Sequence, residues 1–222
     1  LPEFLKNGGT VLVDRNGGTL ITGLNTKAPS NGFKCDTCHD DLTKYTRYKI
    51  ANVTFPSGKV VDSKNQDTNL CISCHQGRES TTSMNIQLAG KDPDKVDAAI
   101  SFKNIHYFAA GASLFGTDAQ GGYEYAGKKY VGRNNHVEGF NNCVNCHQTH
   151  ELGVKLDKCQ ACHATVKTLA DVSTIRMTNS KGDYDGNGKE EGIGVEVENL
   201  QKVLLASMQD YAKTVSGAGI VY

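Results

Sequence analysis

All eight cysteines of the chain occur in pairs that share one pattern, Cys-x-x-Cys followed at once by histidine. This pattern is the attachment motif of c-type haem. Two thiols add to the two vinyl groups of one porphyrin, and the adjacent imidazole reaches the iron from the same side. The spacing therefore predicts four covalently bound haems. Their attachment and proximal ligand residues are Cys35, Cys38 and His39; Cys71, Cys74 and His75; Cys143, Cys146 and His147; and Cys159, Cys162 and His163.

Paired cysteines also occur in zinc sites, disulfides and redox dithiols. Four Cys-x-x-Cys pairs could make two four-cysteine zinc sites, and the last two pairs approach the spacing of a zinc ribbon. None of these alternatives requires a histidine after each pair, and histidine occupies only 7 of the 222 positions. Haem attachment is therefore the favoured interpretation. It implies a periplasmic or extracellular protein, because haem lyases work outside the cytoplasmic membrane.

Three histidines lie outside the four motifs: His106, His136 and His150. Each haem iron has a sixth coordination position, so we expect these three histidines to be distal ligands. His150 leaves the same short segment as His147 and therefore cannot cap the iron that His147 holds. We expect His150 to reach a different haem. The third and fourth haems should also lie close together, because Cys159 follows soon after His150 in the chain.

The supply of histidines is one short of complete bis-histidine ligation. Four haems have eight axial positions, and the chain has 7 histidines. Three alternatives stay open: a different sixth ligand, one open iron, or an eighth histidine outside these 222 residues. A histidine exchanged between identical subunits does not remove the shortage, because each donor then lacks what it lends. Candidates for a different ligand are Met84, Met177 and Met208, although packing is the simpler role for each.

A second group of residues, in the stretch DYDGNGKEEG, resembles a calcium-binding loop. Position 12 of this loop is Gly194, so the usual bidentate glutamate is missing, and Glu196 is the candidate to replace it. The alternative is a tight Asp/Asn/Gly turn that caps the next helix. The predicted calcium residues are Asp183, Asp185, Asn187, Lys189 and Glu191; Asp183, Asp185, Asn187, Gly188 and Glu191 match positions 1, 3, 5, 6 and 9.

The composition indicates what surrounds these sites. Apolar residues make up 38% of the chain, tryptophan is absent, and 24 Lys plus Arg balance 24 Asp plus Glu. Bulky side chains are too few to fill a core easily, and four porphyrins would supply much of the missing apolar surface. Balanced charge favours neither nucleic acid nor an anionic membrane as a partner. No apolar run approaches the roughly 18 residues of a transmembrane helix.

Regular structure is expected to be sparse. Residues 10–22, 51–63 and 121–132 each combine alternating apolar residues with turn residues, which predicts three hairpins. Asp92 and Pro93 predict the start of a helix that runs to about Phe102.

Residues 195–215 predict an amphipathic helix, packed against the haem core or a neighbouring subunit. Its apolar face comprises Val197, Leu200, Val203, Leu204, Met208, Tyr211 and Val215. The predicted fold class is a multihaem cytochrome c, mostly irregular, with short hairpins and a few helices wrapped around four covalently bound haems. Residues 1–165 form the tetrahaem core, and the haem-free residues 166–222 pack on it.

Several stretches of the chain resemble the tetrahaem extracellular cytochromes that polymerise into filaments, or nanowires. They are FPSGKVVDS, NLCISCHQGRES, HYFAAGASLFGTDAQGGYEYAGKKYVG, CVNCHQTH and DYDGNGKEEG. The resemblance covers roughly residues 50–215. It is more specific than the haem motifs alone, because GGYEYAGKKYVG and DYDGNG contain no haem motif.

The resemblance implies an extracellular or cell-surface filament built from copies of this chain. In that family the haems form one continuous chain, all are bis-histidine, and one distal histidine comes from the next subunit. His106, His136 and His150 match distal positions of the family, whereas its eighth histidine has no counterpart here. The implied partners are further copies of the chain and an extracellular electron acceptor or redox protein.

Two functions are therefore expected to compete. The first is an electron-conducting polymer that is not an enzyme, because irons with two axial ligands bind no substrate. The second is a soluble periplasmic tetrahaem carrier with one open haem, which serves a redox enzyme as its partner.

Overall fold

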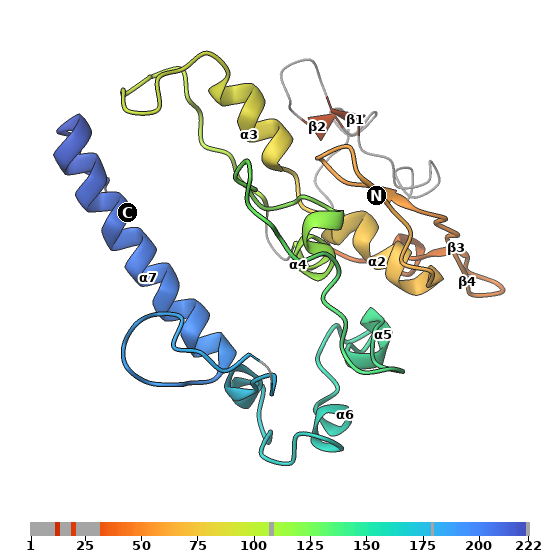
Figure 1. Cartoon of the computed structure of the whole chain (residues 1–222). Coiled ribbons are helices and arrows are strands. Elements are labelled where there is room, and N and C mark those ends of the chain that lie inside the picture. Colours follow the sequence, from red (N-terminus) through yellow and green to blue (C-terminus); the bar gives the residue numbers. More distant parts are fainter. Residues whose placement is uncertain (1–11, 14–18, 21–31, 107–108, 179, 221–222) are drawn as a thin grey trace. The chain divides into compact units, whose positions relative to one another are not determined.

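The computed structural model describes residues 12–13, 19–20, 32–106, 109–178 and 180–220. The chain divides into two compact units (Figure 1). The first unit comprises residues 1–91 and 98–144, and the second comprises residues 92–97 and 145–222. The predicted division after residue 165 was based on haem binding and stays a prediction.

The first unit contains three short antiparallel hairpins. They pair β1 (Leu12–Val13) with β2 (Thr19–Leu20), β3 (His39–Asp41) with β4 (Thr46–Arg47), and β5 (Val53–Thr54) with β6 (Val60–Val61). The hairpins predicted in residues 10–22 and 51–63 are confirmed, although the turn of the first lies outside the described residues. In the second, the Gly58 amide donates to the Phe55 carbonyl at 2.8 Å, and Gly58 has a φ of +87°.

Four helices also contribute to this unit: α2 (Gln66–His75), α3 (Thr81–Leu88), α4 (Ala110–Phe115) and the first residues of α5 (Cys143–Cys146). The Asn65 side chain caps α2 by accepting the Thr68 amide, and Ser80 caps α3 by accepting the Ser83 amide. Helix α4 packs on α2 and continues into a 3-10 turn, η2 (Gly116–Asp118).

The apolar core of the first unit joins the hairpins to α2 and α4. It consists of Tyr48, Ile50, Val53, Phe55, Val61, Leu70, Ile72, Phe115 and Ala119. The rings of Phe55 and Phe115 meet edge to face with centroids 6.3 Å apart. This core therefore holds α2, which carries the second Cys-x-x-Cys-His motif, against the β5–β6 hairpin and α4.

Two predicted elements are wrong. No helix runs from residue 92 to residue 102: the Asp92 side chain accepts the Asp94 amide and closes a single turn. Asp94 then accepts the hydroxyl of Tyr211, so a contact distant in sequence replaces the next helical turn.

Residues 121–132 form a turn but no strand pair. The Lys128 amide donates to the Tyr125 carbonyl at 3.2 Å, which closes the turn. The flanking backbone groups bond elsewhere, because the Glu124 amide donates to Thr81 and the Val131 carbonyl accepts the Thr117 amide.

The second unit contains α6 (Leu156–Gln160), the 3-10 turn η3 (Ala170–Thr174) and the long helix α7 (Ile193–Tyr211), which ends in a π turn at Ala212–Ser216. The helix predicted at residues 195–215 is confirmed. Its first turn packs closely on η3, because a Cβ on Gly192 would lie 2.3 Å from the Thr174 Cα.

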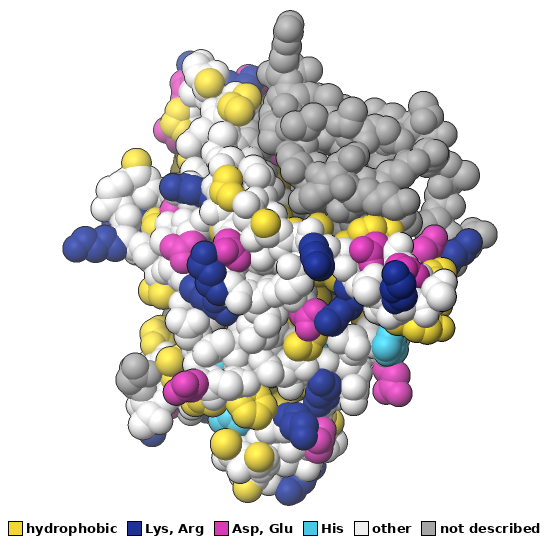
Figure 2. Space-filling view, turned by 90° about the vertical axis from the view of Figure 1, so that its right-hand side faces the viewer, with side chains coloured by type: hydrophobic (Ala, Val, Ile, Leu, Met, Phe, Trp, Pro, Cys, Tyr) yellow, Lys and Arg dark blue, Asp and Glu magenta, His cyan; other side chains and the backbone are white. Residues whose placement is uncertain are grey.

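The second unit has very little core. Among its described side chains only Val166 and Glu196 are buried. The residues of the predicted apolar face of α7 stay about half exposed, from 44% for Leu200 to 59% for Leu204. On the face shown in Figure 2, apolar side chains lie exposed among charges of both signs. No helix in the described part of the chain combines the length and apolar character that a membrane span requires.

Candidate haem-attachment sites

Each Cys-x-x-Cys-His motif lies on a short helical turn. The first forms the turn η1 (Cys35–Thr37), the second ends α2, the third begins with α5, and the fourth runs from the end of α6. The Cys38 amide donates to the Cys35 carbonyl at 3.3 Å, and the His163 amide to the Cys159 carbonyl at 2.8 Å. All eight cysteines are free of disulfides. One turn therefore carries two free thiols and the adjacent histidine, which is what covalent haem attachment requires.

His39 has its ring oriented by the β3–β4 hairpin. Its Nδ1 lies 2.9 Å from the Tyr45 carbonyl oxygen and 3.2 Å from that of Thr46. Carbonyl oxygens only accept, so Nδ1 carries the proton and Nε2 keeps its lone pair. Metal-binding histidines are held in this way by their second nitrogen. Tyr45 has a φ of +52°, a strained conformation that turns its carbonyl toward the ring.

The first and second motifs are held together by the core. The Tyr48 amide donates to the Cys38 carbonyl at 3.2 Å, and Tyr48 packs in the same cluster as Leu70 of α2. Burial raises the pKa of the Cys38 thiol. Burial, and then the neighbouring Cys38, raise the pKa of Cys74 to about 11. Both thiols thus lie in a partly desolvated region that the two motifs share.

The second and third motifs meet where α2 approaches α5. The fully buried hydroxyl of Thr68 accepts the Cys143 amide at 3.3 Å. Cys71, one turn after Thr68, is a hydrogen-bond partner of Cys143. This bond raises the pKa of Cys71 and lowers that of Cys143 to about 6. In a haem-loaded protein these thiols stand for thioether sulfurs, which do not titrate but occupy the same positions.

The third and fourth motifs are joined by a tight loop in the second unit. The Gln148 amide donates to the Gly153 carbonyl and the Lys155 amide to the Cys146 carbonyl, both at 2.8 Å. His147 pairs with Val154 as an isolated β-bridge. The loop therefore places α6 and the fourth motif directly after the third, with His150 at the tip of the loop.

Of the three predicted distal histidines, His106 lies beside the second motif. The Arg78 amide donates to the Ile105 carbonyl at 2.9 Å, which ties this segment to the residues after His75. His106 has a φ of +80°, and its amide donates to the Asn104 side chain at 2.8 Å. Burial, and then the charge of Arg78, lower the pKa of His106. A neutral imidazole is the form that binds iron.

His136 follows a segment that is fixed to α4 and η2. The Asn134 amide donates to the Leu114 carbonyl at 2.7 Å, and the Thr117 amide to the Val131 carbonyl at 3.0 Å. Arg133 extends from this segment and donates to the carbonyls of Ser63 and Asn141 at 3.3 and 2.7 Å.

Gly116 makes this attachment of the 131–134 segment sterically possible. A Cβ on Gly116 would lie 2.3 Å from the Val131 carbonyl oxygen. His136 itself meets Phe140 edge to face, with centroids 6.2 Å apart.

The surroundings of the three candidate methionine ligands do not distinguish any of them as an iron ligand. Met177 is 64% exposed and Met208 is 47% exposed on α7, while Met84 lies on α3. Ligation by methionine therefore stays a prediction.

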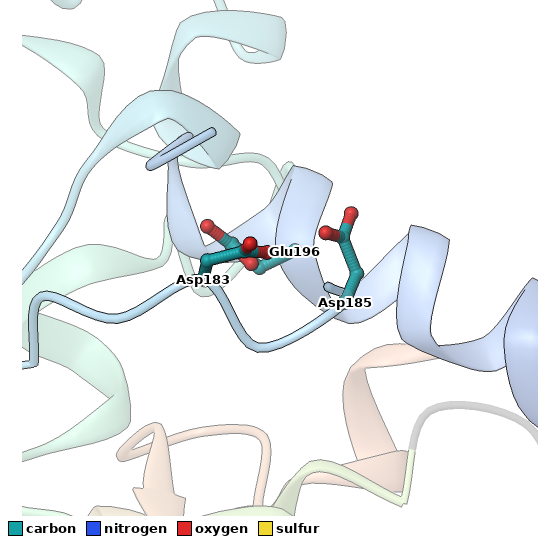
Figure 3. Close-up of side chains that lie close together, drawn as sticks. All are labelled: Asp183, Asp185 and Glu196. Atoms are coloured by element: carbon teal, nitrogen blue, oxygen red, sulfur yellow. The ribbon is translucent and has the colours of Figure 1, made fainter. Parts of the chain in front are cut away.

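The calcium-like loop draws its predicted residues together. Oxygens of Asp183, Asp185 and Glu196 lie within 4.8 Å of one another (Figure 3). The Asn187 side-chain amide donates to Asp185 and Glu191, each at 2.8 Å. The Lys189 amide donates to the Asn187 side chain at 2.8 Å. The loop can thus present carboxylates to a cation, and calcium binding stays a prediction.

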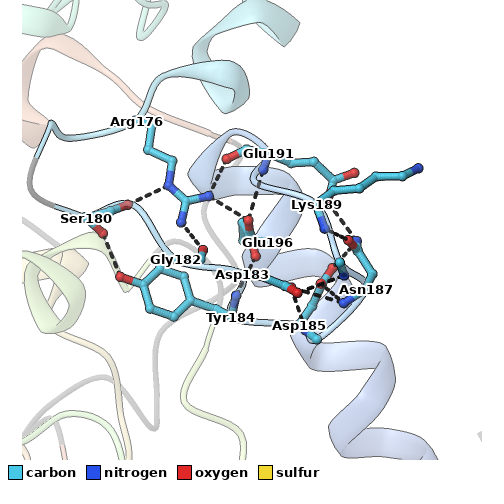
Figure 4. A network of polar contacts seen from close by, with 12 residues as sticks. Arg176, Ser180, Gly182, Asp183, Tyr184, Asp185, Asn187, Lys189, Glu191 and Glu196 are labelled. Carbon is cyan, nitrogen blue, oxygen red and sulfur yellow. Dashed lines mark hydrogen bonds and ion pairs between the residues drawn. The ribbon is translucent and has the colours of Figure 1, made fainter.

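Arg176, which the sequence analysis did not single out, already places a cation beside this loop (Figure 4). Its guanidinium donates to Glu196 at 2.6 Å and to the carbonyls of Ser180, Gly182 and Glu191. The ion pair with Arg176 is the largest cause that lowers the pKa of Glu196 to about 2. Asp183 accepts the amides of Gly186, Asn187 and Gly188, as in an Asx-type turn.

Comparison with known proteins finds polyhaem cytochromes. The chain is 40% identical over 64 residues to the C-type polyheme cytochrome OmcB of Geobacter sulfurreducens, in two strains, and 39% identical to OmcC of the same organism. The aligned residues are 29% of this chain and 7% of each relative, so the chain matches only a small part of them. No family model and no solved structure matches. The match supports a relation to multihaem c-type cytochromes.

Proposed function

We propose that the protein is an electron-transfer cytochrome in which four c-type haems form one chain. The observation that carries the proposal is the succession of contacts between motifs. Tyr48 links the first motif to α2, Thr68 and Cys71 link α2 to Cys143, and the bond between Cys146 and Lys155 leads to the fourth motif. Bound covalently, the haems would supply one-electron chemistry that no side chain of this protein offers.

The residues around the motifs have defined roles in this proposal. His39 offers Nε2 to iron because its Nδ1–H donates to backbone carbonyls. The core that includes Tyr48 and Leu70 excludes water between the first two sites. Gly116 and Asn134 fix the segment that leads to His136. Together these residues hold and orient ligands rather than bind a substrate.

We further propose that the protein acts as a homopolymer, an extracellular filament that delivers electrons to an external acceptor. The support is the resemblance of several stretches to filament-forming tetrahaem cytochromes such as outer-membrane cytochrome E. The half-exposed apolar residues of α7 also offer surface to another copy of the chain. Bis-histidine ligation of every iron, with one ligand from a neighbouring subunit, belongs to this proposal.

A soluble periplasmic carrier with one open haem is the second candidate. One specific observation favours it: the chain has 7 histidines for eight axial positions. An open iron would bind small ligands such as carbon monoxide, whereas an iron with two axial ligands would not.

Two measurements on the native protein separate these proposals. Low-temperature EPR of the oxidised protein, followed by carbon monoxide addition to the reduced protein, reports open irons. Electron micrographs of the same preparation report filaments. Filaments with only low-spin haem support the conductor, whereas a small oligomer with about a quarter of its iron high-spin supports the carrier. A chain whose intact mass includes no haem refutes both.

A further inference from the structure

The contact between α2 and α5 also indicates which cysteines of the second and third motifs face each other. Thr68 and Cys71 lie one turn apart on α2, so they share a face of this helix. Thr68 binds the amide of Cys143, and its hydroxyl also lies 3.5 Å from the Asn142 side chain. Cys143 is therefore held in place at the first turn of α5. There it faces the side of α2 that carries Cys71.

The two cysteines of each motif are not equivalent in this arrangement. Cys71 and Cys143, the first cysteines of their motifs, are hydrogen-bond partners, and both are partly buried. Cys74, the second cysteine of its motif, is exposed. Within the second motif, the first sulfur is thus the one that faces the third motif.

We propose that the second and third haem sites touch through their first sulfurs, Cys71 and Cys143, so that this pair of porphyrins meets at its thioether edges. The inference rests on the proposed electron-transfer function and deepens it. Two sulfurs in contact would provide the shortest path between these two macrocycles. Thr68 would act as a positioning residue, because it fixes Cys143 without touching either porphyrin.

Cross-linking of the full-length chain before haem attachment tests the contact directly. Diamide takes up two electrons and two protons from a pair of thiols, which join as a disulfide while diamide becomes the hydrazine. The variant C74S/C146S keeps Cys71 and Cys143 and removes the second cysteine of each of these two motifs. The matched variant C71S/C143S keeps Cys74 and Cys146 instead. Peptide mapping by mass spectrometry then measures the Cys71–Cys143 and the Cys74–Cys146 disulfides.

We expect the Cys71–Cys143 disulfide to form in native buffer at least tenfold faster than the Cys74–Cys146 disulfide. In concentrated urea the two rates should become similar. Equal rates in native buffer, in a chain whose circular dichroism shows folded helices, would overturn the proposal.

If the chain without haem does not fold, the contact between Cys71 and Cys143 is tested on the haem-loaded protein instead. A density map of that protein should place the two first sulfurs within about 4.5 Å, the usual limit of atomic contact. The contact is refuted if the sulfurs of Cys71 and Cys143 lie farther apart than the sulfurs of Cys74 and Cys146. The mass of the same sample reports whether four haems are attached, so failure of the proposed function is seen separately.

Discussion

Replacing Gly116 with alanine should loosen the segment that leads to His136. Gly116 has φ +49° and ψ −128°, a conformation that costs alanine about 1–3 kcal/mol. The new Cβ would also lie 2.3 Å from the Val131 carbonyl oxygen and 2.6 Å from that of Gly132, and such overpacking costs about 1–3 kcal/mol. The expected loss in the free energy of unfolding is the sum, about 2–6 kcal/mol.

Urea denaturation of the haem-loaded protein measures this loss. With a denaturant slope of about 2 kcal/mol per molar, the midpoint should fall by about 1–3 M. Two control variants separate the cost of the backbone conformation from the cost of the steric overlap. Gly127 has φ +77° and no atom near its missing Cβ, so Gly127→Ala should show only the backbone cost. Gly122 has neither a positive φ nor an atom near its missing Cβ, so Gly122→Ala should leave the urea midpoint nearly unchanged.

A second readout links this packing to the haem sites. If His136 is a distal ligand, Gly116→Ala should raise the high-spin fraction in the EPR spectrum, whereas Gly127→Ala should not. The reasoning is refuted if Gly116→Ala and Gly127→Ala have the same midpoint, because the close approach to the 131–134 segment would then carry no cost.

Thr68→Val removes the buried hydroxyl that accepts the partly buried amide of Cys143, and it should cost about 1–3 kcal/mol in urea denaturation. Thr68→Ser keeps the hydroxyl and most of the stability. Glu196 has a pKa of about 2, below its ordinary value of 4.5, so its stabilising effect is present above pH 4.5 and is lost as the pH falls toward 2. In the Glu196→Gln variant, the thermal midpoint should therefore fall less between pH 4.5 and pH 2 than in the original protein. If the midpoint depends on pH in the same way in both proteins, the Glu196–Arg176 ion pair does not stabilise the fold. Calorimetric titration should detect one calcium ion with a dissociation constant of about 10⁻⁴ to 10⁻³ M that Asp185→Asn abolishes; absence of binding in both proteins would leave the loop as a turn closed by Arg176.

Features that depend on residues close in the sequence were predicted well. The hairpin around Gly58 and helix α7 both have strong local patterns, and the structure has a strand pair and a helix at these places. Haem attachment at the four Cys-x-x-Cys-His motifs stays a prediction. Helix α2 was missed because it is buried on several sides: Thr68, Asn69 and Ser73 are buried beside Leu70 and Ile72, so its sequence lacks an amphipathic period.

Features that depend on distant contacts could not be predicted. The Asp92 side chain accepts the Asp94 amide, as a capping residue does, yet Asp94 accepts the Tyr211 hydroxyl and the segment forms a turn without a helix. The second and third motifs are brought together by the contact of Thr68 and Cys71 with Cys143, which no local pattern encodes. No local sequence pattern marks Arg176 either. Its hydrogen bonds are to Glu196 and to backbone carbonyls that only the fold brings near it.

The nearly coreless second unit has a consequence for how the protein matures. With only Val166 and Glu196 buried among its described side chains, this unit gains little free energy from its own packing to offset the entropy of ordering its backbone. Its folded population must therefore depend on what binds it, by mass action. We expect amide hydrogen exchange in α7 to slow in step with haem attachment or assembly, while α2 in the packed core of the first unit is protected earlier. The two units of one chain would thus become stable at different stages of its maturation.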